Sequence, residues 1–140
     1  MFSWIYKILF ANYPKDHRFY YLSLIKENEG FSIHGLWPQY DINKYPTFCN
    51  PVTFDLSNLT DILPELHKNW YSNRGPDESF WKHEYEKHGS CVFSKMTELE
   101  YFQKTLDLFN KAIELNLPEK YQNDKTNKCL IPVDLSFNFI

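Results

Sequence analysis

Glycine is scarce in this sequence, and internal repeats are absent. Only 4 of its 140 residues are glycine and 8 are proline, so the chain carries no low-complexity signal. Hydrophobic residues make up 43% of the chain and aromatic residues 19%, a composition that excludes a disordered polymer. No run of small or polar residues divides the chain, and we therefore expect one domain over residues 1–140.

Long apolar runs and an excess of positive charge are missing as well. No stretch approaches the length that crosses a membrane, so we expect no membrane partner. The formal charge of -3 argues against a protein that binds nucleic acid over a broad basic surface. A small nucleic-acid cleft is still compatible with this charge, because an enzyme needs positive charge only where the reacting phosphate lies.

Two short histidine segments are the most informative part of the chain. Residues 33–38 read Ile-His-Gly-Leu-Trp-Pro, and residues 80–91 read Phe-Trp-Lys-His-Glu-Tyr-Glu-Lys-His-Gly-Ser-Cys. Together they hold three of the five histidines, which are His34, His83 and His88. Imidazole is the one side chain whose unperturbed pKa lies near neutrality, so two segments that bring it to one cleft can both remove and donate a proton.

A zinc site is the first interpretation to test, because His83-Glu84 followed by another histidine is similar to the helix of zinc metalloproteases. The spacing is wrong for it. His83 and His88 are five residues apart, about 140° around a helix, and cannot both face one metal ion. We expect no metal and no other cofactor.

Acid/base chemistry on RNA remains. A ribonucleotide carries its own nucleophile, the 2′-hydroxyl, so an enzyme needs one base, one acid for the departing 5′-oxygen, and cations near the crowded phosphate. His34 and His88 fit the proton transfers, while Lys87 and His83 can offset the negative charge. Glu84 lies one helical turn before His88 and is placed to orient that ring or raise its pKa.

The sequence predicts a hairpin near its start. Residues 19–25 are rich in Tyr, Leu and Ile, and the turn-like residues 27–30 separate them from a second strand that begins at Phe31. A period of two places His34 on the face opposite Ile33, so that His34 need not lie in the core. Gly35 is then expected to let the chain turn.

Three helices and a last strand are predicted further along. Asp61 can cap a helix that runs to Trp70. A second helix spans about Ser79 to His88 and is expected to end at Gly89 in a left-handed conformation. The capping box at Thr97 opens a long core helix. Alternation predicts a strand over residues 130–139. We expect an α+β fold with a mainly antiparallel sheet flanked by helices, and a cleft between the strand and the helix that carry the histidines.

The three cysteines are an odd number and lack Cys-x-x-Cys spacing, so a structural zinc site is not expected. One disulfide and one free thiol is the simplest arrangement. Cys49 with Cys91 is an attractive pair, because it ties the segment after the first histidine motif to the end of the second. Three reduced cysteines in a cytosolic protein are the alternative.

The two histidine segments closely resemble the two active-site segments of the ribonuclease T2 family, the transferase-type acid ribonucleases that include the plant S-ribonucleases. A looser resemblance extends from the strand at Phe19 through the helix at Phe102. It implies an endoribonuclease that cleaves single-stranded RNA without a metal. The products it implies are a 2′,3′-cyclic phosphate and then a 3′-phosphate.

The resemblance also implies residue roles. His34 and His88 are the acid/base pair, with His88 as base and His34 as acid in the first step, and Trp37 contributes to nucleobase binding. The supporting residues that it implies are Glu84 and Lys87 for the transition state, His83 for phosphate, and the Cys49–Cys91 disulfide. Gln39 replaces the acidic residue often found after Trp-Pro, which leaves the base preference open.

The partner implied is single-stranded RNA, not DNA, and we expect a monomer. The resemblance favours a secreted or lumenal location, whereas residues 1–11 show no clear signal peptide. Two other interpretations stay open. The first is a catalytically inactive relative that binds RNA or another protein, and the second is a histidine-based metal protein.

Overall fold

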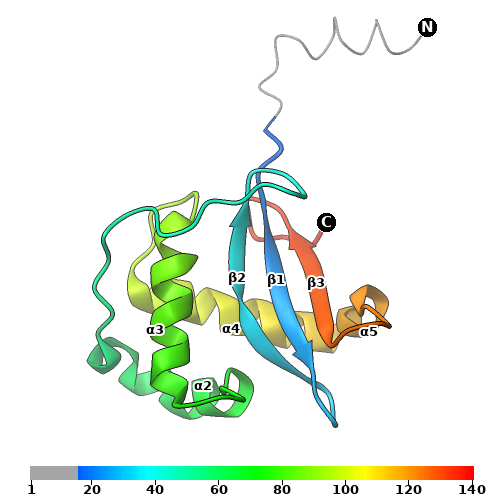
Figure 1. Cartoon of the computed structure of the whole chain (residues 1–140), viewed down its shortest axis with the longest axis horizontal. Helices are drawn as coiled ribbons and strands as arrows, with labels where there is room; N and C mark the ends of the chain where they lie inside the picture. Colours follow the sequence, from blue (N-terminus) through cyan, green and yellow to red (C-terminus); the bar gives the residue numbers. More distant parts are fainter. Residues whose placement is uncertain (1–15) are drawn as a thin grey trace, which may run out of the picture.

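A three-stranded antiparallel sheet with the strand order β2-β1-β3 forms the centre of the fold. The computed structural model describes residues 16–140, so the interpretation of residues 1–11 lies outside the described residues. Strand β1 spans Phe19–Lys26, β2 spans Phe31–Gln39 and β3 spans Lys128–Val133. Helix α4 runs across the back of the sheet, and α3 stands beside the edge strand β2 (Figure 1). The α+β fold predicted from the sequence is confirmed.

The hairpin of β1 and β2 is also confirmed. Alternate residues of β1 point to the back of the sheet, where Tyr20, Leu22 and Leu24 are buried. Gly30 has a φ of 73° in the connecting turn, a left-handed conformation that glycine adopts without steric cost. This turn brings Phe31 opposite Lys26 and starts the register of β2.

The last strand is shorter than its sequence pattern suggested. Strand β3 pairs with β1 and ends at Val133, and the predicted extension to Phe139 is wrong. The Asp134 carboxylate accepts hydrogen bonds from the backbone N–H groups of Ser136 and Asn138, at 2.8 Å and 2.9 Å, and closes a turn. The chain therefore folds back, and Phe139 forms an isolated bridge with Val133.

Helix α4, Glu98–Glu114, is the main support of the sheet and is followed by the short helix α5, Leu117–Tyr121. The predicted capping box is present, with Thr97 and Glu100 satisfying each other's backbone N–H groups. The spacing of three and four predicts a buried stripe of Leu99, Phe102, Leu106, Phe109 and Ile113. Phe102, Leu106 and Phe109 are buried, but Leu99 and Ile113 are 41% and 42% exposed. The buried face is completed by Tyr101, Thr105, Leu108 and Ala112.

The helical segment that precedes α3 begins earlier in the chain than predicted. Asp55, not Asp61, caps a 3₁₀ helix, η1 (Leu56–Ile62), by accepting a hydrogen bond from the Ser57 backbone N–H. Helix α2 (Leu63–Asn69) follows without a side-chain cap. Asp61 lies inside η1, so the prediction that it caps the helix is wrong.

Helix α3, Asp77–Lys87, carries the second histidine segment. His88 is its C-cap, and Gly89 opens a 3₁₀ turn, η2 (Gly89–Cys91), without a positive φ. The predicted left-handed role of Gly89 is therefore wrong. A Cβ at this position would lie 2.5 Å from Cδ1 of Tyr85, so glycine is needed because the Tyr85 ring packs directly against the backbone.

No helix in the described part of the chain is long and apolar enough to span a bilayer.

A disulfide joins Cys49 to Cys91, as expected, and Cys129 is a buried free cysteine. The bridge ties the long segment after β2 to η2. Two backbone hydrogen bonds support the same connection, from Phe48 N–H to the Lys87 carbonyl and from Cys49 N–H to the Ser90 hydroxyl, at 2.8 Å and 2.9 Å. The end of α3 is thus held to the rest of the fold by a covalent link.

Replacing both Cys49 and Cys91 by Ser should lower the free energy of unfolding by about 4 kcal/mol, because the bridge restricts a long loop of the unfolded chain. Urea unfolding of the oxidised wild type and the double variant measures this difference. A reducing agent should destabilise the wild type similarly and leave the double variant unchanged. Equal stability of the two oxidised proteins would contradict a stabilising role for the bridge.

Candidate active site

A cleft of about 1020 Å³ lies between the front face of the sheet and α3. All six of the predicted active-site residues outside the disulfide line it, namely His34, Trp37, His83, Glu84, Lys87 and His88. The remaining lining residues belong to the three strands, to α3 and to the loops after β2, before α3 and before β3. Two motifs separated by more than forty residues in the sequence therefore meet in one cavity.

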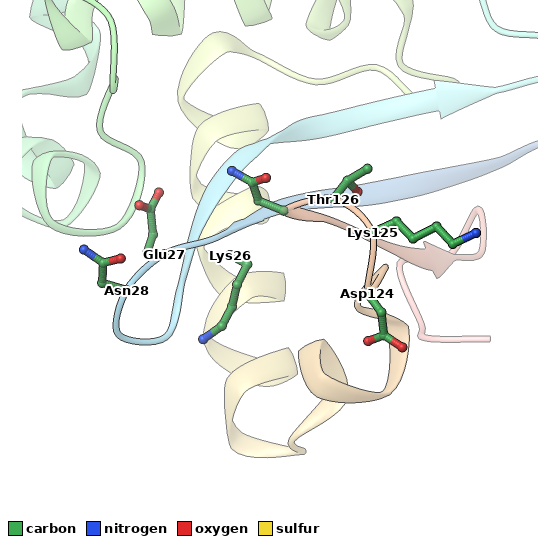
Figure 2. A pocket seen from close by; sticks show the side chains of 7 residues that line it. Lys26, Glu27, Asn28, Asp124, Lys125 and Thr126 are labelled. Atoms are coloured by element: carbon green, nitrogen blue, oxygen red, sulfur yellow. The ribbon is translucent and has the colours of Figure 1, made fainter.

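A second hollow at the end of the hairpin lacks these residues. It is lined by polar side chains of residues 26–28 and 124–127. The labelled side chains point in different directions, with Asp124 and Lys125 turned away from Glu27 (Figure 2). Because no groups converge there, this hollow offers no arrangement for chemistry.

A β-bulge in β2 places the first motif. Ser23 pairs with Gly35 and Leu24 pairs with Ile33, so His34 is an extra residue without a direct partner on β1. Ile33 and Leu36 can consequently both face the core, where each is fully buried. The alternation of side chains along the strand therefore predicts the face of His34 correctly. Beyond His34 the bulge shifts the alternation by one residue and brings Trp37 to the same cleft.

Gly35 lies inside β2, so the predicted turn at this residue is wrong. Gly35 allows the side chains of Glu84 and Trp37 to approach the backbone of β2, because a Cβ there would clash with Oε1 of Glu84 and lie 2.7 Å from Nε1 of Trp37. The missing side chain lets α3 pack directly onto the strand. The Trp37 indole N–H then donates a hydrogen bond of 2.9 Å to Glu84 Oε1.

The backbone of His34 is anchored by a hydrogen bond, and its ring is partly buried. Its carbonyl accepts a hydrogen bond of 3.0 Å from the indole N–H of Trp70, which is fully buried. Its Nε2 lies 3.7 Å from Oε2 of Glu84, and its side chain remains 36% exposed. Burial, followed by the positive charges of Lys128 and Lys87, lowers the pKa of His34 to about 4.

Glu84 is almost fully buried, with 2% of its surface exposed. Burial raises its pKa to about 7, against the opposing effects of the Trp37 hydrogen bond and the Lys87 charge. The carboxyl group contacts Trp37 and His34 and makes no hydrogen bond to His88, so the predicted orientation of the His88 ring by Glu84 is wrong. The hydrogen bond from the Trp37 indole N–H instead holds the Glu84 carboxyl group against β2.

His88 is buried at the end of α3. Its ring stacks on Trp37, with a centroid distance of 5.0 Å and an interplanar angle of 25°. Its Nδ1 is buried and has no hydrogen-bond partner. Burial first, and then the charges of Lys87, His34 and His83, lower its pKa to about 3. The ring is therefore neutral over most of the pH range.

Trp37 brings the two imidazoles together. The His34 ring packs edge-on against Trp37 with a centroid distance of 4.9 Å, and the His88 ring stacks on it. The two imidazole centroids are therefore no more than about 10 Å apart, a separation that one bound phosphodiester can bridge. Lys87 and His83 line the same cleft, and this set can move protons while offsetting negative charge.

Two further cations of the cleft, Arg74 and Lys128, were missed by the sequence reasoning. Arg74 belongs to the loop before α3, and no motif marks it. Lys128 precedes the residues where the last strand was expected to begin, and the alternation with the buried Cys129 and Ile131 is the signal that would have placed it on the cleft side.

Comparisons with known proteins show the family to which the chain belongs. A model of the ribonuclease T2 family matches residues 5–126. Ribonuclease DdI of Dictyostelium discoideum is 35% identical over 116 residues, which are 79% of this chain and 51% of that protein. The chain thus spans about half the length of this relative.

Solved structures share the fold. Ribonuclease MC1 from bitter gourd seeds superposes with a TM-score of 0.69 at 20% identity, covering 88% of this chain and 93% of that one. The structure of RNase NT in complex with 5′-AMP gives a TM-score of 0.67 at 24% identity and covers 90% of each chain. At these identities the likeness concerns the fold alone.

Substituting Gly35 by Ala should break the contact of β2 with α3 and cost about 1 to 3 kcal/mol of stability, because the added methyl group overlaps the Glu84 carboxyl group. Urea unfolding and the NMR signal of the Trp37 indole N–H measure the effect. Gly75→Ala is the matched control, since a Cβ at Gly75 meets nothing within 4 Å. An unshifted indole signal in Gly35→Ala would contradict the close approach.

Proposed function

We propose that this chain, which belongs to the ribonuclease T2 family, is an endoribonuclease that cleaves single-stranded RNA by two-histidine acid/base catalysis without a metal. The observation that carries the proposal is the packing of both His34 and His88 on Trp37 in one cleft. The family match and the name of the Dictyostelium relative support RNA cleavage as the reaction class. The complex of RNase NT with 5′-AMP supports a nucleotide as the ligand of this fold.

His88 acts as the base of the first step in this proposal. Its low pKa keeps the ring neutral, so that the imidazole is in the form that can accept a proton. The ring takes the proton of the 2′-hydroxyl as that oxygen attacks the phosphorus. Negative charge on the bound phosphate raises the pKa of the imidazole and makes it a better base than in the empty cleft.

His34 and Glu84 supply the proton for the departing 5′-oxygen. With a pKa of about 4 for His34 and about 7 for Glu84, the proton of this pair resides on Glu84 between these values. Binding of an anionic phosphate favours a positive imidazole, and His34 then delivers the proton. Lys87 and His83 offset the charge of the five-coordinate phosphate, and the first product is a 2′,3′-cyclic phosphate. In the second step water attacks this phosphate while the two histidines exchange their roles as acid and base, and the product is a 3′-phosphate.

Substrate and surroundings follow from the same chemistry. DNA lacks the 2′-hydroxyl and is excluded as a substrate, and Trp37 is the proposed nucleobase contact. The structure brings the Gln39 amide to within 3.0 Å of the Asp41 carbonyl, where it donates a hydrogen bond. The Cys49–Cys91 disulfide favours a secreted or lumenal location, and we propose a monomer with one domain over residues 1–140.

His34→Ala and His88→Ala should each lower kcat for single-stranded RNA by at least about 100-fold, whereas EDTA should leave the wild-type rate unchanged. End analysis of the fragments should find 2′,3′-cyclic phosphates. His17→Ala is the matched control, because this exposed histidine lies outside the cleft. RNA retention without scission would favour the inactive relative, and loss of activity in EDTA would favour the metal protein.

The pH dependence of kcat/KM should be bell-shaped, with the alkaline limb near 7 set by the proton held on Glu84. Glu84→Gln keeps a hydrogen-bond acceptor for Trp37 but removes this proton. Its alkaline limb should therefore move down towards pH 4, the pKa of His34. Steady-state rates from pH 3 to 8 measure the profile. An unmoved limb in Glu84→Gln would show that another group holds the proton.

A further inference from the structure

We propose that Arg74 and Lys128 form a subsite for a second phosphate of the RNA chain, at the end of the cleft away from Lys87. The inference rests on the proposed ribonuclease function and extends it, because it assigns the contact that favours an oligonucleotide over a dinucleotide. Both side chains line the same cavity as the two catalytic histidines.

The two cations lie at one end of the cleft. Arg74 precedes the first residue of α3, whereas Lys87 is its last residue, and a helix of 11 residues is about 16 Å long. Lys128 is the first residue of β3 and pairs with Ile25 near the end of β1 (Figure 1). The proposed subsite is therefore separated from Lys87 by roughly the length of α3.

The register of β3 directs Lys128 to the front of the sheet. Cys129, Ile131 and Val133 are fully buried against the back layer, so Lys128 and Leu130 belong to the opposite face. Both of these line the cleft together with residues of β1. The front of the sheet thus forms a continuous floor from His34 on β2 to Lys128 on β3.

The loop that carries Arg74 is preformed. The Ser72 backbone N–H donates a hydrogen bond of 2.8 Å to the Asp77 carboxylate, and the Ser72 hydroxyl accepts bonds of 3.2 Å from the backbone N–H groups of Arg74 and Gly75. The other oxygen of Asp77 lies 2.6 Å from the His67 ring. Phosphate binding therefore need not order this loop, which lowers its entropic cost.

The loop and β3 are both tied to the hairpin. Asn73 donates a hydrogen bond of 3.1 Å to Glu27, and the Lys26 backbone N–H donates one of 2.7 Å to the Asn127 carbonyl. These contacts fix the backbone of Arg74 and the backbone of Lys128 relative to the same turn. The spacing of the two cations is thus built into the fold.

Neither cation has an acidic partner. Within residues 16–140, Arg74 and Lys128 take part in no ion pair. Among the described residues, Glu84 is the only carboxylate that lines the cleft, and it contacts Trp37 and His34. A chain with a net charge of -3 therefore presents Arg74, Lys87 and Lys128 to one cavity, an arrangement that attracts a polyanion.

The positive charges of Arg74 and Lys128 also affect the ionisation of His34. Lys128 and Arg74 are among the groups that lower the pKa of His34. An RNA phosphate between them would neutralise this effect and so raise the pKa of the His34 imidazole. The subsite would then improve both binding and the supply of the acid.

The experiment compares substrates with and without a second phosphate. Arg74→Gln, Lys128→Gln and the double variant, each measured at its own pH optimum because both charges lower the pKa of His34, should cleave a dinucleoside monophosphate within about twofold of the wild-type kcat/KM. Each single variant should lose about 5- to 10-fold on a single-stranded hexanucleotide. Lys125→Gln is the matched control, since Lys125 lies in the neighbouring loop and outside the cleft.

Salt dependence separates an ionic contact from a structural effect. The slope of log(kcat/KM) against log salt concentration for the hexanucleotide should become shallower by about 0.7 for each cation removed. Equal losses on both substrates, an unchanged slope, or the same loss in Lys125→Gln would overturn the subsite while leaving the ribonuclease function intact.

If the wild type cleaves neither substrate, the proposed function fails and the subsite is tested alone. A fluorescent 2′-deoxy hexanucleotide then serves as a probe that cannot be cleaved. Its affinity should fall by about 5- to 10-fold in each single variant and not in Lys125→Gln, with the same change of salt slope. Unchanged affinity would overturn the inference.

Discussion

The packing around the Trp37 indole is the constraint on which the candidate site depends. One side chain contacts the edge of His34, stacks on His88 and donates its N–H to Glu84. These contacts require α3 to lie directly on β2, which only the absent side chain of Gly35 permits. The two histidine rings are thus positioned by their packing on one indole ring and by the absence of a Cβ at Gly35.

Burial sets the chemistry of the site more strongly than direct pairing does. It lowers the pKa of both histidines and raises that of Glu84, so the empty cleft holds neutral groups around nearby cations. Such a cleft gains most from a bound anion, because the anion offsets the repulsion among the cations and favours charged imidazoles. The net negative charge of the chain is compatible with this arrangement, since its positive side chains are concentrated where a phosphate would lie.

Local patterns predicted the elements well where short-range interactions decide the structure. The capping box at Thr97 and the hairpin turn near Gly30 depend on neighbouring residues, and both are present. The predictions failed where packing decides. Gly35 was predicted to form a turn, and Gly89 was predicted to end a helix. Each is a glycine for another reason, because a neighbouring side chain occupies the space that its Cβ would take. The strand after Val133 failed because the Asp134 side chain closes a turn that alternation does not reveal.

The sequence alone was sufficient to identify the two histidine motifs, the family they resemble, and the candidate acid/base residues, because these depend on residue type and spacing along the chain. Only the tertiary structure decided which groups touch. The bulge at His34 turns Trp37 into the cleft, and the indole N–H of Trp37 then holds the Glu84 carboxyl group against β2. Arg74 and Lys128 become neighbours of the site for the same reason, since sheet pairing and loop anchoring bring together residues that no local sequence pattern connects.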